Sequence, residues 1–262
     1  MGHQRLGTIP TSQSWNTVVG LLGTDVYGGF ESPNRLAAAT LDAAQPALAV
    51  ANQDDGFRYT FYLLSQIALA SRQPDWLERL QALGIHLSAE SSVFDLTSQV
   101  QYTLDDYIAR TGHPTDISEM AQRAAAEALT SLASNHTIGL FDKGGDELQS
   151  TIRLMSTQRG FGELGQRFFG RFMARFLNFY LSRVTAAYVG GTGRPSVGAV
   201  TAFNRSLRRH CEESARIVRD YCGEWYSKTE YEHRINRKNT GKFMAHAVTK
   251  LSAELRKQRE RI

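Results

Sequence analysis

The stretch from Phe161 to Tyr188 constrains the fold more than any other part of the chain. Two adjacent apolar stripes run along it at helical spacing, one of Phe168, Phe172 and Phe176 and the other of Phe169, Met173, Leu177 and Tyr180. Residues three or four apart lie on the same face of an α-helix, so the pattern predicts a long helix with a broad apolar arc. Other elements must cover this arc, and we expect the core to be built on this helix.

A basic stripe flanks the apolar arc. Arg167, Arg171 and Arg175 lie four residues apart, which places three guanidinium groups in one row of the same helix. We expect this arginine ridge to face outward or toward acidic groups.

Helical signals mark most of the remaining chain. Apolar residues recur at helical spacing, with Gly, Pro or capping residues near the ends, over 11–22, 35–51, 56–71, 74–84, 93–109, 117–133, 147–157, 197–222 and 238–262. Pro46 is expected to kink the helix over 35–51, and Gly223 to end the helix over 197–222. The aromatic segment from Trp225 to Tyr231 is expected to be a connector. The predicted fold is all-α, a bundle of roughly eight to ten helices.

Charge divides the chain into two parts. Residues 1–150 hold 8 Lys and Arg against 17 Asp and Glu, a net of −9, and residues 151–262 hold 22 against 9, a net of +13. The turn Lys143–Asp146 immediately precedes the change of sign. We therefore expect an acidic helical lobe over 1–145 and a basic helical lobe over 146–262, either as two lobes or as one continuous domain.

The opposite signs allow two interpretations. The two parts attract each other within the molecule, or the basic part faces an external partner, which is then nucleic acid or an acidic protein.

The sequence also bears on the compartment. No run of about 18 apolar residues occurs, so we expect no membrane-spanning helix and no membrane partner. The first residues lack the apolar core of a secretory signal. Cys211 and Cys222 fall in one expected helix, about 16 Å apart along its axis, which is too far for a disulfide. Two reduced thiols predict a cytoplasmic protein.

Motifs for metals and phosphates are incomplete. Glu230 and His233 form one Glu-x-x-His pair, whereas a di-iron bundle needs two, and no CxxC or HExxH occurs. The glycine-rich segment Gly190–Arg194 suggests anion binding by backbone amides and by Arg194, but it lacks the Lys-Ser/Thr of a P-loop. We expect no metal and no cofactor, and we keep Arg194 as a candidate anion contact.

One spacing points to catalysis. The segment Arg205-Ser-Leu-Arg-Arg-His210 resembles, over six residues, the arginine-to-histidine signature of HEPN-type ribonucleases. The resemblance implies metal-independent RNA cleavage at a dimer axis, with His210 as general acid and base and Arg205 stabilising the developing phosphate charge. The alternative interpretation is a charged helix face in solvent.

The C-terminal part combines aromatic and basic residues. Such residues can stack bases and contact phosphates, or they can form a connector whose rings fill the edge of the core. The candidate binding residues here are Trp225, Tyr226, Lys228, Tyr231, Arg234, Arg237, Lys238 and Lys242, to which the ridge adds Arg167, Arg171 and Arg175.

These observations favour a non-catalytic function. The leading interpretation is an interaction or adaptor subunit of a bacterial-type cytoplasmic complex, monomeric or homo-oligomeric, whose basic C-terminal half contacts nucleic acid or an acidic protein partner. The alternative is a HEPN-like ribonuclease of the toxin or antiviral-defence type that uses Arg205 and His210.

Overall fold

A computed structural model describes residues 12–23, 32–111, 114–134, 145–188 and 197–257. Within these ranges the protein is all-α, as the sequence predicts, and contains twelve helices and no strand. The helices are α1 (Gln13–Gly23), α2 (Pro33–Ala43), α3 (Gln45–Ala51), α4 (Asp55–Ala70), α5 (Trp76–Ala82), α6 (Val93–Thr111), α7 (Asp116–Ser134), α8 (Gly145–Met155), α9 (Gln158–Tyr188), α10 (Val197–Ser214), α11 (Arg216–Tyr231) and α12 (Arg237–Lys257).

The helix count exceeds the predicted range because two expected helices are each divided. The segment over 35–51 splits at Ala44 into α2 and α3, since Pro46 occupies the first turn of α3 and cannot continue the preceding helix. The segment from Val197 splits at Ala215 into α10 and α11. Helix α11 then runs on to Tyr231, so the expected aromatic connector is helical.

Gly223 lies inside α11 and does not end it, contrary to the expectation. A Cβ atom on this residue would lie 2.3 Å from the carbonyl oxygen of Gln158 at the start of α9. Glycines on α9 make the same close approach, since a Cβ on Gly165 would lie 2.2 Å from Sγ of Cys222. Glycine here permits α9 and α11 to pack backbone to backbone.

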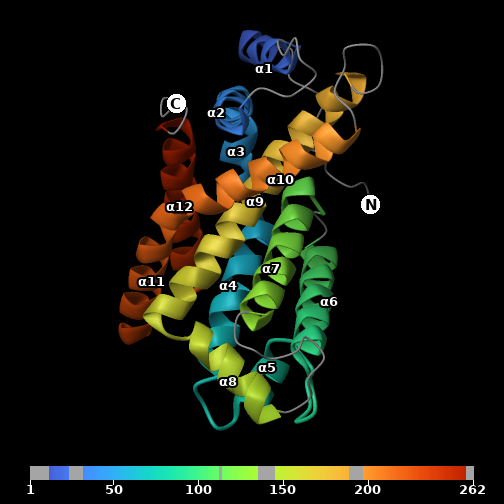
Figure 1. Cartoon of the computed structure of the whole chain (residues 1–262). Helices are drawn as coiled ribbons and strands as arrows, with labels where there is room; N and C mark the ends of the chain where they lie inside the picture. The colour runs from blue at the N-terminus through green and yellow to red at the C-terminus, as the bar shows by residue number, and fades with distance from the viewer. Residues whose placement is uncertain (1–11, 24–31, 112–113, 135–144, 189–196, 258–262) are drawn as a thin grey trace.

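The predicted apolar arc of α9 is the centre of the core. Helix α9 runs through the middle of the molecule, where it packs against α7, α10 and α11 (Figure 1). Phe57 of α4 stacks on Phe172 with ring centroids 4.2 Å apart and on Phe168 at 5.9 Å, and all three rings are fully buried. The arc is therefore covered by helices from both charge segments.

Helix α12 closes the core on the α4 side. Phe243 of α12 stacks on Phe61 of α4 at 5.9 Å and on Trp225 of α11 at 4.5 Å. One cluster of buried side chains thus draws on residues before and after position 145. The division of the chain into lobes over 1–145 and 146–262 stays a prediction.

The two cysteines lie on different helices, not on one as expected. Cys211 belongs to α10 and Cys222 to α11, and both thiols are buried and unbridged. Burial raises the pKa of both thiols because the thiolate would be desolvated. Across the described segments, none of the helices combines the length and apolarity needed to cross a bilayer.

Candidate functional site

The arginine ridge of α9 faces acidic groups of neighbouring helices. Nε of Arg171 lies 3.2 Å from Oε1 of Glu212 on α10, and its second guanidinium nitrogen lies 3.8 Å from Glu127 on α7. Arg175 pairs with Glu127 as well. Arg208 of α10 completes the network with contacts to both glutamates, at 3.2 Å and 3.8 Å.

This network joins the acidic and basic segments of the chain. Glu127 comes from the segment with net negative charge, and the arginines come from the segment with net positive charge. Arg171 is buried, and desolvation lowers its pKa while the two carboxylates oppose that shift. Arg167, the first residue of the ridge, donates to the Ser131 hydroxyl of α7 at 2.8 Å. The ridge therefore has partners within the molecule.

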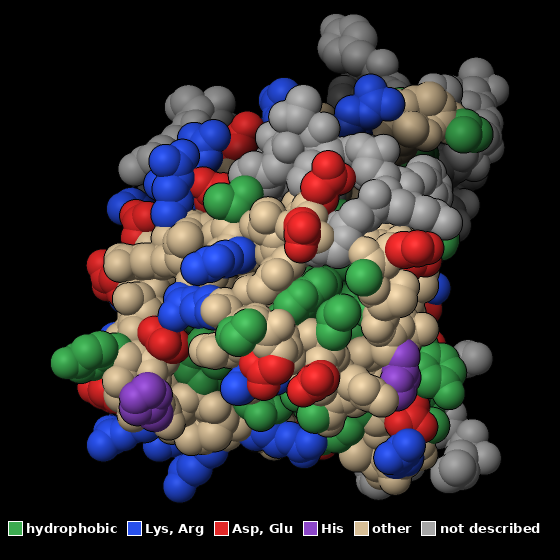
Figure 2. All heavy atoms as spheres, turned by 90° about the horizontal axis from the view of Figure 1, so that it is seen from below, with side chains coloured by type: hydrophobic (Ala, Val, Ile, Leu, Met, Phe, Trp, Pro, Cys, Tyr) green, Lys and Arg blue, Asp and Glu red, His purple; other side chains and the backbone are tan. Residues whose placement is uncertain are grey.

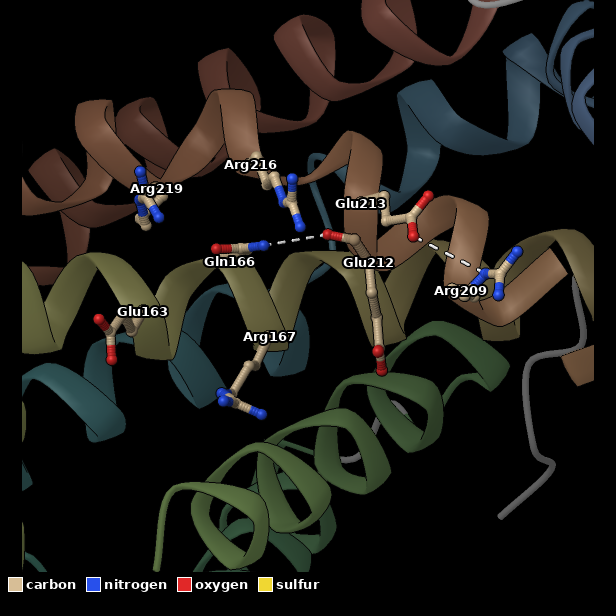
Figure 3. Close-up of a pocket in the computed structure, with 8 residues that line it drawn as sticks. All are labelled: Glu163, Gln166, Arg167, Arg209, Glu212, Glu213, Arg216 and Arg219. Carbon is tan, nitrogen blue, oxygen red and sulfur yellow. Dashed lines mark hydrogen bonds and ion pairs between the residues drawn. The ribbon is translucent and has the colours of Figure 1, made fainter. Parts of the chain in front are cut away.

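A groove of about 650 Å³ lies along α9 beside the junction of α10 and α11 (Figure 3). It is lined by charged and amide side chains, namely Glu163, Gln166, Arg167, Arg209, Glu212, Glu213, Arg216 and Arg219. A second groove of about 600 Å³ shares Glu163 and Arg219 with it, so the two continue one another along α9 and α11. We call the first of these the α9–α11 groove.

The acidic residues of the groove are engaged with arginines at its margins. The Glu212 carboxylate extends toward α7 in Figure 3, where it meets Arg171 and Arg208. Glu213 lies 3.7 Å from Arg209, and Glu163 lies 3.1 Å from Arg159. The carboxylates of the groove are therefore paired at its margins and not in its middle.

The cations in the middle of the groove come from α11. Arg216 forms no ion pair with any described residue, and Arg219 pairs with its chain neighbour Asp220 at 3.3 Å. Figure 3 shows Arg216 directed from α11 toward Gln166 of α9, and Arg219 one turn further along α11, beside α9. Gly162 allows this approach, because a Cβ there would lie 2.5 Å from the carbonyl oxygen of Arg219.

Helix α12 carries a second basic feature, which we call the α12 stripe: Lys238, Lys242, His246, Lys250 and Lys257. These residues fall within about 120° of the helix circumference and extend over about 28 Å. Helix α12 as a whole has six Lys and Arg against one Glu. Lys238, Lys242 and Lys257 are exposed and have no ion pair within the described ranges. Three lysines of the stripe thus have no acidic partner among the described residues.

Helix α11 lies between the groove and the stripe. Arg219 and Asp220 face the groove side, and the next residue, Tyr221, contacts the stripe. Its ring centroid lies 5.9 Å from that of His246 and 5.8 Å from Nζ of Lys250.

Two of the three aromatic residues expected to bind a partner pack against the core. Tyr226 is fully buried and stacks on Phe161 at 4.0 Å, and its hydroxyl has no hydrogen-bond partner among the described atoms. Trp225 is half-buried against Phe243. The remaining members of the tract, Lys228, Tyr231, Arg234, Lys238 and Lys242, are exposed.

Arg237 has an internal role in this tract. Its guanidinium carbon lies 4.9 Å from the ring centroid of Tyr59 and 5.0 Å from that of Tyr107, and the two rings stack at 3.6 Å. It also donates to the Tyr107 hydroxyl at 3.0 Å, and that hydroxyl donates to Asp55. Burial, followed by the bond to Asp55, raises the pKa of Tyr107 to about 12. Arg237 therefore attaches α12 to α4 and α6.

The structure separates Arg205 from His210. The two residues lie on α10 at positions about 140° apart around the helix axis. Arg205 is exposed, whereas His210 is buried, and its Nε2 has no hydrogen-bond partner within the described structure. Arg194 and the glycine-rich segment Gly190–Arg194 lie outside the described residues.

Charged and hydrophobic side chains are intermixed at one end of the molecule. On the described surface seen in Figure 2, acidic and basic side chains alternate, and hydrophobic groups form separate small patches. Over the described positions, no cluster of three or more His, Cys, Asp or Glu residues is arranged to hold a metal ion.

Comparison of the chain with known protein families, with curated proteins and with solved structures finds no match to any of them. The candidate sites therefore rest on the geometry of this structure alone. The sequence does not single out Arg209, Arg216 and Arg219. Its pattern predicts one helix over 197–222, and no residue signals the break at Ala215 that brings these arginines to the groove.

Proposed function

We propose that the protein is a non-catalytic interaction or adaptor subunit whose α12 stripe contacts the phosphate backbone of a nucleic acid. The observation that carries the proposal is that Lys238, Lys242 and Lys257 form no ion pair with the described residues. The arginine ridge, by contrast, is matched by Glu127 and Glu212. The C-terminal tract expected from the sequence contributes Lys238 and Lys242 to this stripe, and Lys257 extends it beyond that tract.

The chemistry of the stripe favours a polyanion over a protein partner. Protein interfaces depend on a few buried aromatic or arginine anchors, whereas the stripe presents lysine ammonium groups and one histidine along about 28 Å of helix. Ammonium groups act as point charges that match evenly spaced phosphates. Tyr226 is buried and Tyr231 lies outside the stripe, so the proposal rests on phosphate contacts and not on base stacking.

The proposal places the protein in the cytoplasm. The two buried thiols support this assignment, because both are unbridged.

The test is binding of a short fluorescently labelled DNA or RNA duplex, followed by anisotropy at several salt concentrations. Wild-type affinity should fall steeply with salt, because each phosphate contact contributes about 0.9 to the logarithmic slope. The triple variant K238A/K242A/K257A should bind more weakly and show a slope smaller by about 2–3.

The matched control is R79A/R110A/R123A, which removes the same charge from exposed arginines elsewhere on the surface. These arginines form i,i+4 surface pairs, which contribute little to stability. Duplex binding should survive in the control. If the control loses as much affinity as the stripe variant, or if wild type does not bind at low salt, the nucleic-acid proposal is wrong and an acidic protein partner takes its place.

No contact among the described residues favours the ribonuclease alternative. His210 is buried whereas Arg205 is exposed, which disfavours a shared catalytic role for the two residues.

A further inference from the structure

Gln166, Arg216 and Arg219 line the α9–α11 groove together. In Figure 3, Gln166 lies on α9, and Arg216 and Arg219 lie on the part of α11 that runs beside it. The two arginines are three residues apart, about one helical turn, with a rise of about 4.5 Å between them. Two guanidinium groups and one amide therefore border the same groove.

Local packing holds two of these groups in place. Cγ of Arg219 lies 3.2 Å from the position that a Cβ on Gly162 would occupy, so the stem of this arginine rests against the backbone of α9. Nε2 of Gln166 donates to the carbonyl oxygen of Glu212 at 3.1 Å. An amide nitrogen carries two hydrogens, so this group has a second donor besides the bond to Glu212.

The charge balance in the middle of the groove is positive. Arg216 has no ion pair with a described residue, and the Arg219–Asp220 pair is exposed, with 46% and 76% of the two side chains accessible. Exposed pairs of this kind are worth about 1 kcal/mol or less, so a ligand can displace the Asp220 carboxylate. The three glutamates of the groove face other arginines.

We propose that Gln166, Arg216 and Arg219 form a binding site for a phosphate group. Guanidinium groups bind oxyanions through two parallel N–H donors, and a phosphate offers acceptor oxygens to several such donors at once. The groove, at about 650 Å³, is larger than a phosphate ion and accommodates a phosphate ester. The site is separate from the α12 stripe and does not depend on it.

The direct test is isothermal titration of wild-type protein with inorganic phosphate and pyrophosphate at low ionic strength. R216A/R219A should lower the affinity about tenfold or more, because each arginine removed takes away a charge-assisted hydrogen bond. R216K/R219K keeps the charge but loses the planar fork, so its affinity should lie between those of wild type and the alanine variant. R110A/R123A is the charge-matched control and should bind as wild type does.

A parallel titration with the labelled duplex identifies the source of the phosphate. If R216A/R219A loses phosphate binding and keeps duplex binding, the ligand is a small phosphate compound. If duplex binding falls in this variant more than in R110A/R123A, the groove takes a phosphate of the nucleic acid. Either result supports the site, provided that circular dichroism shows the variant to be folded.

The proposal fails if neither phosphate nor duplex binding differs between R216A/R219A and R110A/R123A. The K238A/K242A/K257A variant separates this failure from that of the proposed function. If the stripe variant loses duplex binding while R216A/R219A keeps both phosphate and duplex binding, the α12 proposal stands and the groove site is wrong.

Discussion

Arg171 of α9 and Glu212 of α10 face each other across 3.2 Å, from Nε to Oε1, at a point where 8% of the arginine side chain is accessible. A guanidinium this deeply placed needs carboxylates, because removing a charge from water is costly unless the charge is paired. Glu212 supplies the nearer carboxylate, and Glu127 lies at 3.8 Å. The internal attraction between the two charge segments is concentrated at this network.

Glu212→Gln should therefore destabilise the fold by about 1–3 kcal/mol, since Arg171 and Arg208 would each lose their nearer carboxylate. The midpoint of urea unfolding measures this change. Glu163→Gln is the control, because it removes an i,i+4 partner of the 90% exposed Arg159 and should cost about 0.5 kcal/mol or less. Equal effects of the two substitutions would show that the network contributes no more than a surface pair.

Gly162→Ala should destabilise the protein by about 1–3 kcal/mol, because the added Cβ meets the carbonyl oxygen of Arg219 at 2.5 Å and α9 and α11 must separate. Gly20→Ala provides the opposite case. Gly20 lies exposed in α1 with no atom within 4 Å of an added Cβ, so alanine there should stabilise by about 0.5–1 kcal/mol. Thermal unfolding of both variants checks the prediction, which a stable Gly162→Ala protein would contradict.

Arg237→Ala should cost about 1–2 kcal/mol, because it removes both the cation–π contacts with Tyr59 and Tyr107 and the hydrogen bond to the Tyr107 hydroxyl. Arg234→Ala is the control, since this exposed arginine has one contact, at 3.6 Å, with Glu232. Hydrogen exchange in α12 offers a second measurement. If hydrogen-exchange protection of α12 is unchanged in Arg237→Ala, the contacts of Arg237 with Tyr59 and Tyr107 do not hold this helix in place.

His210 predicts a dependence of stability on pH. Burial lowers its pKa below the ordinary value of 6.5, because desolvation disfavours the imidazolium, and Glu213 opposes the shift. Between the two pKa values the unfolded chain binds more protons than the folded chain. The contribution of this histidine is therefore fully present above pH 6.5 and is lost as the pH falls through the folded pKa.

The substitution His210→Gln isolates this contribution. The difference in unfolding free energy between wild type and the variant should shrink as the pH is lowered from about 7.5 to about 5. His86→Gln, at an exposed position, is the matched control. A difference that stays constant over this range would show that His210 does not remain neutral in the fold.

The sequence alone predicts the central helix α9 and the all-α fold class. The spacing of Phe168, Phe172 and Phe176 reports which face of α9 is buried, and it does so locally, within one helix. The spacing of Arg167, Arg171 and Arg175 places them in one row equally well. It does not reveal that Glu127 and Glu212 meet that row, because both partners come from other helices whose register only the folded structure sets.

The groove could not be predicted because its geometry depends on a helix break without a local signal. Ala215 has high helix propensity, so no Gly or Pro marks the junction of α10 and α11. Glycine is common just after a helix end, so the sequence predicts an end at Gly223, whereas in the structure its lack of a side chain permits the contact with Gln158. A glycine that ends a helix and one that permits close packing look alike in a single sequence.

The stacking of Phe61 on Phe243 also sets an order of events during synthesis. The two rings are 182 positions apart in the chain and 5.9 Å apart in the folded protein. At about 5–20 residues per second, a ribosome needs on the order of 10–40 s to make the segment between them. For that interval the apolar face of α4 lacks its final cover, so the nascent chain is exposed to aggregation until α12 emerges.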